Sequence, residues 1–322
     1  MQAFGLGPRL IGQLMLDHTE LPRYLAKIDR TFGISDLLKL KTDKETIIRY
    51  YTESEKAYRV FHSRDGAVHM TLAEKQSSRP DSLGQAKLIA EQAQEISANR
   101  ILELGSGKGF NVAYIANVRP NSELVGIDLT PTHVAIAEKK YAGLGNLRFK
   151  VGDFQALPFA NDEFDLVFEV EAVCHAQDPQ KAFREAHRVL KPGGRMTLFD
   201  GFRAPGLSSQ PDEIQTAVHL VELTMAVPEF PTLEQWLDLA RSVGFVVIRT
   251  DDLSDAIMPN LEKFQVLARG FYKYPALSKQ MIRLLPPSLV KNSVAGLLMP
   301  FTVSSGAQRY HQIVLDKPNT LE

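Results

Sequence analysis

The stretch ILELGSGKGFN, residues 101–111, is an apolar run that ends in Gly105, Gly107 and Gly109 and continues as a helical pattern. Glycines at such a turn permit tight backbone conformations and the close approach of a ligand, and the next helix offers unpaired amide groups at its start. The spacing is G-x-G-x-G, with Phe110 where the third glycine of a dinucleotide-binding G-x-G-x-x-G pattern would fall. The stretch therefore predicts a strand, a nucleotide-binding turn and a helix, and it disfavours a hydride-transfer dehydrogenase.

The alternation of helical and strand patterns continues on both sides of this turn. A helix is expected before it, with Asp81 as N-cap, and another is expected to open at Asp178 and Pro179 and to stop at the glycines of KPGG. Apolar runs predict further strands at 122–130, 147–151, 164–173, 195–202 and 307–318. Such alternation is typical of an α/β fold with a mostly parallel, doubly wound sheet.

Three helix-rich segments fall outside the alternation, and we expect them to cover one edge of the sheet. The predicted organisation is a helical lid at 1–80, a core at 81–202, a cap insertion at 203–231, more core at 232–254, a helical cap at 255–305, and the last core strand and tail at 306–322. Ligands of open parallel sheets bind at the carboxyl ends of the strands, so covers at that edge would enclose the site.

Composition excludes some partners. The chain has 322 residues, 44% of them hydrophobic, and a net charge of −1, which provides no positive field for binding nucleic acid. Cys174 is the single cysteine, so no intrachain disulfide forms, and no secretory signal is recognised at the start of the sequence; a cytoplasmic location is expected. The apolar stretch 281–303 contains Arg283, Lys291 and prolines, which disfavours a membrane span but leaves membrane-surface contact open. The oligomeric state is not predicted.

Two acidic residues follow strands where a nucleoside could be held. Asp128 ends the strand expected within the run 122–130, about 20 residues beyond the glycines, where a carboxylate can accept both hydroxyls of a ribose. Asp153 follows the run 147–151, where it could meet an adenine edge. A solvated turn is the alternative for Asp128.

The motifs ELGSGKG, GIDLT, GDFQALPF and RVLKPGGR together resemble those of the Rossmann-like, seven-stranded S-adenosylmethionine-dependent methyltransferases. The resemblance covers residues 81–202 closely and 232–254 and 306–318 more loosely. It implies a cosubstrate, S-adenosylmethionine, and a set of residues that would bind it: Glu103, Gly105, Ser106, Gly107 and Gly109 at the methionine part, Asp128 and Leu129 at the ribose, Asp153 and Phe154 at the adenine, and Glu169 nearby.

The stretch FEVEAVCHAQDP, residues 168–179, runs from an apolar strand into polar side chains. By strand alternation Glu169 and Glu171 share a face, with Glu171 nearer the open edge. EAVCHA resembles the EATCHAP segment of sterol and terpenoid C-methyltransferases, and YYTESEKAYRVFHSRDGAVHM resembles their N-terminal pattern, with Val173 and Gln177 departing from it. The matching aromatic and histidine positions are Tyr50, Tyr51, Tyr58 and His69.

Methylation of an alkene carbon creates a carbocation, which requires an anion and aromatic faces nearby until a proton leaves. We therefore expect Glu171 as the anion and His175 as the proton acceptor. Tyr50, Tyr51, and Phe199 or Phe202 would supply cation–π stabilisation of about 2 kcal/mol each when desolvated. The predicted acceptor is a small hydrophobic isoprenoid: a prenyl diphosphate, a sterol or a terpenoid.

Other interpretations stay open. Glu171 could hold a loop or the cosubstrate's ammonium, His175 and His69 could be structural, and Cys174 is expected to be a small buried residue. An O- or N-methyltransferase, or a quinol-ring C-methyltransferase, is the main alternative function, and a scaffold that binds the cosubstrate without catalysis is the third. Motifs typical of metal sites are missing, and DDLSD at 251–255 is expected to be a solvated turn.

Overall fold

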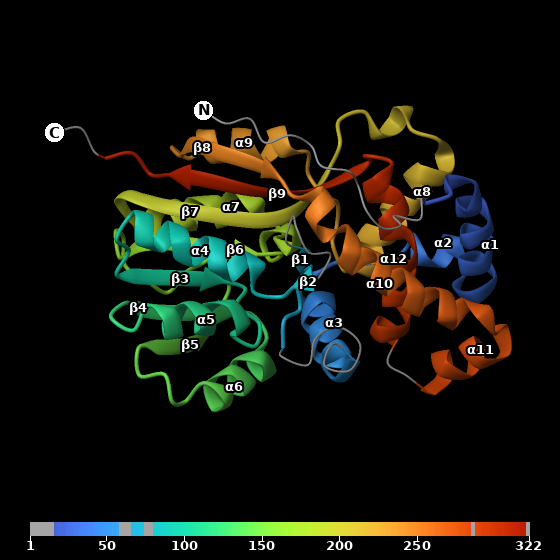
Figure 1. Cartoon of the computed structure of the whole chain (residues 1–322), viewed down its shortest axis with the longest axis horizontal. Coiled ribbons are helices and arrows are strands. Elements are labelled where there is room, and N and C mark those ends of the chain that lie inside the picture. Colours follow the sequence, from blue (N-terminus) through green and yellow to red (C-terminus); the bar gives the residue numbers. More distant parts are fainter. Residues whose placement is uncertain (1–15, 58–65, 74–79, 285–286, 320–322) are drawn as a thin grey trace, which may run out of the picture.

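A single seven-stranded sheet forms the centre of the computed structural model, which describes residues 16–57, 66–73, 80–284 and 287–319 (Figure 1). The strands are β3 Arg100–Leu104, β4 Glu123–Asp128, β5 Leu147–Val151, β6 Phe164–Val170, β7 Leu190–Arg203, β8 Val246–Asp252 and β9 Gln308–Asp316. Their order is β5-β4-β3-β6-β7-β9-β8; β3 to β7 pair in parallel, and β9 is antiparallel to β7 and β8. The prediction of a mostly parallel, Rossmann-like sheet is confirmed.

Alternating side chains of the strands build a core on each face of the sheet. On β3, Ile101 joins the cluster that includes helices α4 (Gly84–Glu95) and α5 (Phe110–Val118). Leu102 joins the cluster with α7 (Pro179–Val189) and α9 (Leu233–Ser242), while α6 (Pro131–Lys140) packs on β4 and β5. Strands buried on both faces account for the continuous apolar runs of the sequence.

In the described part of the chain, seven further helices gather beyond the carboxyl ends of the parallel strands, at the right of Figure 1. They are α1 Leu21–Phe32, α2 Ile34–Leu37, α3 Lys44–Ala57, α8 Asp212–Thr224, α10 Ser254–Lys273, α11 Pro275–Leu284 and α12 Pro287–Ser304. Short elements complete the fold: strands β1 Leu72–Ala73 and β2 Pro80–Asp81, and 3-10 turns η1 His18–Glu20, η3 Val173–His175 and η4 Leu207–Ser209. Helix α12 packs against α8 and α10, so the helical end has a core of its own.

The apolar stretch at 281–303 divides between α11 and α12, and Pro300 lies inside the second helix. Among the residues that the structure describes, no helix is both long and apolar enough to span a bilayer.

The predicted helix ends are confirmed in one case and wrong in others. Asp178 caps α7 by accepting from the N–H of Lys181, and Pro179 is the first helical residue, as expected. The N-cap prediction for Asp81 was wrong, because Asp81 belongs to β2 and its carboxylate accepts from the N–H of Leu83, one residue before α4 begins. The helix before KPGG ends at Val189, and those glycines already belong to β7.

Candidate active site

The glycine turn after β3 has the conformation that its sequence predicts. Gly105, Gly107 and Gly109 all have positive φ angles, of 64°, 51° and 76°, which side-chain-bearing residues rarely adopt. A Cβ on Gly105 would lie 2.4 Å from the Cβ of Ala172, so this turn is in tight contact with the segment that follows β6. The glycine turn and the polar stretch after β6 therefore form one surface.

The acidic residues expected at the cosubstrate lie around this turn and hold its backbone. One carboxylate oxygen of Asp128 accepts from the N–H of Gly107 at 2.8 Å and the other from Thr130. Glu103 is buried and accepts from Asn111 and from the N–H of Val112, and burial raises its pKa to about 8. These contacts fix the turn against α5 and β4.

Asp153 lies farther along the same edge and is covered by the N-terminal helix α3. Its carboxylate accepts from Lys44 Nζ at 3.0 Å and from the N–H of Gln155, and these bonds, together with the charge of Lys44, hold the pKa of Asp153 below its usual value even though burial opposes them. Helix α3 therefore reaches the predicted adenine end of the site.

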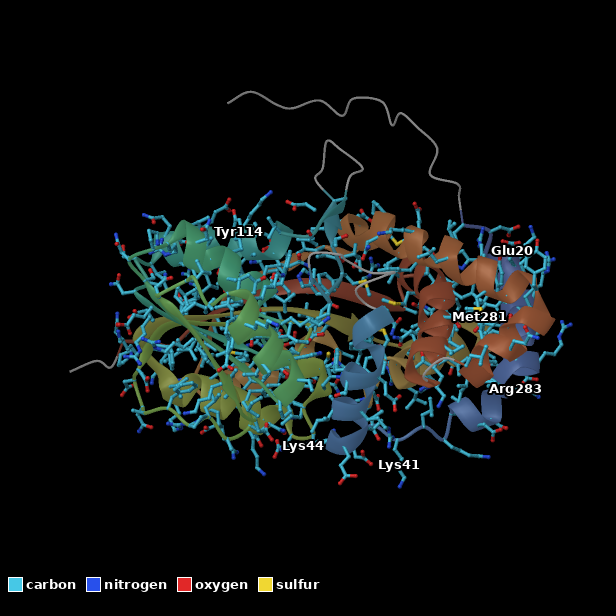
Figure 2. All side chains as sticks on the ribbon, turned by 90° about the horizontal axis from the view of Figure 1, so that it is seen from below. Glu20, Lys41, Lys44, Tyr114, Met281 and Arg283 are labelled. Carbon is cyan, nitrogen blue, oxygen red and sulfur yellow. The ribbon has the colours of Figure 1, made fainter. Side chains whose placement is uncertain are left out.

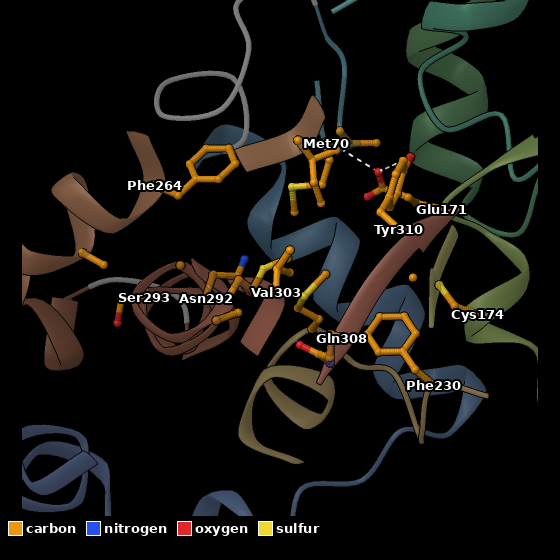
Figure 3. Close-up of a pocket in the computed structure, with 18 of the residues that line it drawn as sticks. Met70, Glu171, Cys174, Phe230, Phe264, Asn292, Ser293, Val303, Gln308 and Tyr310 are labelled. Atoms are coloured by element: carbon orange, nitrogen blue, oxygen red, sulfur yellow. Dashed lines mark hydrogen bonds between the residues drawn. The ribbon is translucent and has the colours of Figure 1, made fainter. Parts of the chain in front are cut away.

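The strand β6 ends at Val170, three residues earlier than predicted. Glu171 has a left-handed backbone with φ of 55°, so the expectation that Glu169 and Glu171 share a strand face was wrong. Glu169 is buried, and its Oε2 accepts from the N–H groups of Ala172 and Val173. Glu171 instead extends toward a cavity, where its Oε1 accepts from the N–H of Met70 at 2.7 Å and the hydroxyl of Tyr310 at 2.9 Å (Figure 3).

A third buried carboxylate, Asp200 near the end of β7, completes an acidic cluster. It accepts from the N–H of Cys174 at 2.9 Å and of Gly201 at 2.8 Å. Burial raises the pKa of Glu171 to about 8 and that of Asp200 to about 7, and burial and the neighbouring Asp200 raise the pKa of Glu169 well above its ordinary value. Burial makes the ionised carboxylates unfavourable. A positive charge that binds beside them would stabilise these anionic forms.

A tyrosine–histidine pair faces this cluster. The hydroxyl of Tyr51 lies 2.8 Å from Nε2 of His175, and Nδ1 of His175 lies 3.1 Å from the carbonyl oxygen of Ala226. A carbonyl only accepts, so these contacts assign the proton to Nδ1 and leave Nε2 as the acceptor. Burial lowers the pKa of His175, which keeps the imidazole neutral and able to take a proton.

These groups line one apolar cavity of about 300 Å³ between the sheet edge and the helical end. Its polar end is formed by Glu171, His175 and Asp200, and aromatic rings of Tyr50, Tyr51, Phe202 and Phe230 border it. The remainder is lined mainly by aliphatic and aromatic side chains of α10, α11 and α12: Ile257, Phe264, Leu267, Ala268, Phe271, Met281, Val290, Ala295 and Met299. The cavity is therefore apolar along most of its wall and polar at the end formed by the carboxylates.

Not every predicted residue reaches this cavity. Phe202 lines it, whereas Phe199 is enclosed in the core. His69 lies beside the start of α5 instead: Nδ1 donates to the carbonyl of Met70 at 2.9 Å, Nε2 lies 3.2 Å from the side-chain oxygen of Asn111, and burial lowers the pKa of His69. Tyr58 lies outside the described residues.

The remaining predicted cosubstrate residues keep to the glycine turn and the adjoining loops. Ser106 is buried against Gly126. Leu129 and Phe154 are half-buried in the loops after β4 and β5.

Two site residues were missed in the sequence. Asp200 stands near the carboxyl end of a predicted strand, and that position was a usable signal. Tyr310 comes from the antiparallel β9 and reaches Glu171 only through the sheet topology. In the described part of the chain, no group of three or more His, Cys, Asp or Glu side chains is placed to hold a metal ion.

Comparison with known proteins agrees with this geometry. Residues 102–198 match the family model described as a methyltransferase domain. Residues 102–198 are thus similar to the methyltransferase domain family, and the fold and the glycine turn agree with the class I, S-adenosylmethionine-dependent group that the sequence motifs resemble.

Relatives of this chain include both C- and O-methyltransferases. Over 190 residues the chain is 32% identical to 24-methylenesterol C-methyltransferase 2 of Oryza sativa subsp. japonica, covering 58% of this chain and 51% of that protein. It is 29% identical over 180 residues to erythromycin 3''-O-methyltransferase of Saccharopolyspora erythraea, covering 54% and 59%. The chain thus spans about half the length of these curated relatives.

Among solved structures, geranyl diphosphate C-methyltransferase from Streptomyces coelicolor A3(2), in complex with Mg²⁺, geranyl diphosphate and S-adenosyl-L-homocysteine, has a similar fold. Its TM-score is 0.61 at 17% identity, and the match covers 85% of this chain and 97% of that one.

Proposed function

We propose that this protein is a C-methyltransferase that transfers the methyl group of S-adenosylmethionine to an alkene carbon of an isoprenoid. The observation that carries the proposal is the cavity itself, where buried carboxylates and aromatic rings meet at one end of an otherwise apolar volume. The partial identity to a sterol C-methyltransferase supports the same acceptor class.

The glycine turn, Asp128 and Asp153 would hold the cosubstrate at the carboxyl ends of β3 to β5, next to the cavity. A Cβ added to Gly107 would lie 3.7 Å from Val68, which is ordinary van der Waals contact, and Val68 lines the cavity, so the glycine turn lies against the cavity wall. The cosubstrate supplies a methyl group whose bond to sulfur breaks with the electron pair kept on sulfur, while the π electrons of the alkene form the new C–C bond and leave a carbocation.

The residues of the cavity then act on that positive charge. Glu171 and Asp200 stabilise it from a fixed, water-poor position, and the ring of Tyr51 adds cation–π attraction. Binding a cation lowers the raised pKa values of both carboxyls, so their anionic forms become populated when they are needed.

A proton must leave the carbon next to the cation to restore the alkene. His175 is neutral, and its Nε2 already bonds the Tyr51 hydroxyl. In the proposed step, the Tyr51 oxygen takes the substrate proton as its own proton passes to Nε2 of His175, and the imidazolium later releases that proton. The proton count balances, and no further reactant is needed.

The lining favours an uncharged isoprenoid, such as a sterol or terpenoid, over a diphosphate. Arg309 is the only lysine or arginine among the cavity-lining residues that the structure describes, and its guanidinium already lies 3.6 Å from Asp252. A diphosphate would meet Glu171 and Asp200 with little opposing positive charge.

The test is methyl transfer from isotopically labelled S-adenosylmethionine to a panel of sterols, terpenoids, prenyl diphosphates, quinols and phenols, with products read by mass spectrometry. Label on an isoprenoid carbon, lost in Glu171→Gln and kept in the surface control Glu138→Gln, supports the proposal. Label only on phenols or quinols, with loss in His175→Ala but not in Glu171→Gln, contradicts it. That outcome would favour the alternative function, an O- or ring-methyltransferase. The similarity to erythromycin 3''-O-methyltransferase supports this alternative.

A further inference from the structure

A second hollow lies outside the candidate active site, between helices α1 and α10. It is a groove of about 570 Å³ lined by eight residues. Five of these are basic: Arg23, Lys27, Arg30, Arg269 and Lys273. We call these five residues the basic groove.

The spacing of the basic residues places them in two rows. Arg23, Lys27 and Arg30 follow one another at intervals of four and three residues along α1, and Arg269 and Lys273 are four apart on α10. Such intervals put side chains on one face of a helix. The two rows therefore face one another across the groove.

This positive charge is poorly neutralised. Arg269 pairs with Glu20 at 3.5 Å, which is the one acidic partner that the described residues give to the basic groove. The Nε atom of Arg269 is buried without a hydrogen-bond partner, and the guanidinium lies 5.4 Å from the ring centre of Tyr24. Lys27 lies over the same ring, at 5.3 Å. The groove therefore suits an anionic partner.

Helix α10, the residue after its end and the neighbouring helix α11 carry exposed apolar side chains. Val266 precedes Arg269 by three residues on α10 and is 67% exposed; Tyr274 is 55% exposed, and Leu284 at the end of α11 is 83% exposed. In Figure 2, Glu20 at the start of α1 and Arg283 on α11 lie at this same helical end of the molecule. Basic residues together with exposed apolar ones are typical of a surface that binds anionic membranes, because each type matches a different layer of the lipid interface.

The cavity of the candidate active site reaches the surface on the same helix. Leu267 lines that cavity and is 45% exposed, and Phe271 lines it one turn later. In the sequence, Arg269 lies between these two residues and Lys273 follows them. Both basic residues line the basic groove on the other side of α10. One helix thus borders both the apolar cavity and the basic groove.

We propose that the face formed by α1, α10 and α11 docks on a membrane surface that contains anionic lipid. The phosphate groups of the lipids occupy the basic groove, and Val266, Tyr274 and Leu284 enter the interfacial layer. If the proposed function holds, an apolar acceptor passes from the bilayer into the cavity beside Leu267. Docking itself does not depend on the identity of that acceptor.

The test is co-sedimentation of the full chain with vesicles of phosphatidylcholine alone and of phosphatidylcholine mixed with phosphatidylglycerol. We expect binding to the mixed vesicles only. It should weaken as salt is raised from about 0.1 M to about 1 M, because the Debye length falls from ~10 Å to ~3 Å. The variant Arg23→Gln/Lys27→Gln/Lys273→Gln should lower the partition coefficient by on the order of 100-fold.

The matched control is Lys139→Gln/Arg148→Gln/Arg184→Gln, which removes the same charge from exposed positions on the sheet domain and should bind as the unmodified chain does. Two further variants, Val266→Ser and Leu284→Ser, test the apolar side chains. Each should weaken vesicle binding without changing the binding of inorganic pyrophosphate.

Three results would overturn the proposal: equal binding to both kinds of vesicle, no binding to either, or loss of binding in the control triple variant to the same extent. Binding of pyrophosphate in the groove without vesicle binding would assign it to a soluble anion and also reject membrane docking. Vesicle binding by a chain that methylates no isoprenoid would leave docking intact and reject only the proposed function.

Discussion

The hydroxyl of Tyr310 donates to Oε1 of Glu171 at 2.9 Å, which joins the last strand of the sheet to the residue that follows β6. The two residues are 139 positions apart in the sequence, and both line the cavity. Because Glu171 also accepts from the N–H of Met70, its carboxylate is held by the N-terminal segment and the last strand at once. The central anion of the candidate site therefore depends on chain regions outside the methyltransferase domain match.

Removing that hydroxyl with Tyr310→Phe should raise the pKa of Glu171 further above 8, because the hydrogen bond now favours the ionised form. We expect kcat/KM to fall near neutral pH and to recover toward higher pH, with the acidic limb of the pH profile displaced upward. Tyr141→Phe, at the end of α6 and outside the cavity, is the control and should leave the profile unchanged. An unshifted profile in Tyr310→Phe would contradict a role for ionised Glu171.

The buried carboxyl of Glu171 should also affect the free energy of unfolding. Its pKa is about 8 in the folded protein against 4.5 for an ordinary glutamate, so between these values the native state binds more protons than the unfolded state. Stability therefore falls as pH rises through that interval, by as much as ~1.4 kcal/mol per pH unit for this one group.

Glu171→Gln should remove this contribution, so that the difference in unfolding free energy between about pH 5 and about pH 8 becomes smaller. Urea denaturation at both pH values measures it, with Glu138→Gln as the surface control. An unchanged difference would show that the carboxyl ionises at its ordinary pKa.

Gly105→Ala should disable the glycine turn. The new Cβ would lie 2.4 Å from Ala172, and the φ of 64° adds a backbone cost, so we expect destabilisation of about 1–3 kcal/mol and loss of cosubstrate affinity. Calorimetric titration with S-adenosylhomocysteine and thermal denaturation measure both. Gly143→Ala, where a Cβ meets no atom within 4 Å, should be tolerated.

Tyr51→Phe tests the proposed proton transfer through the Tyr51 hydroxyl to His175, and it leaves the carboxylate of Glu171 in place. The ring stays and the hydroxyl bonded to His175 is lost, so kcat should fall by about 10²–10⁴ with little change in acceptor KM. Tyr50→Phe, which loses a hydroxyl bonded to Asn292 at 2.7 Å, is the neighbouring control and should keep most of kcat. Equal losses in both variants would argue for packing instead of proton transfer.

Much of the sheet was predictable because glycine turns and apolar runs are local signals. The turn at Gly105, the helix cap at Asp178 and the position of Asp128 all follow from patterns within a few residues. The left-handed backbone of Glu171 is different, since it is stabilised by contacts from distant segments that no local pattern reports.

The same reason explains what was missed in the site. Asp200 and Tyr310 meet Cys174 and Glu171 only because β7 lies between β6 and β9 in the sheet. Tyr51 and His175 were each predicted from a resemblance, but their hydrogen bond joins α3 to η3 across 124 positions. Sequence patterns identified the chemical groups, and the topology decided which of them touch.

Helix α3 has a consequence for how the two reactants influence one another. Lys44, at its start, bonds Asp153 at the cosubstrate end, and Tyr51, two turns later, borders the acceptor cavity. A helix that contacts both compartments is a route by which the occupancy of one can alter the affinity of the other, and thermodynamic linkage requires any such effect to be equal in both directions. The affinities of the two reactants for this protein are then linked through the position of a single helix.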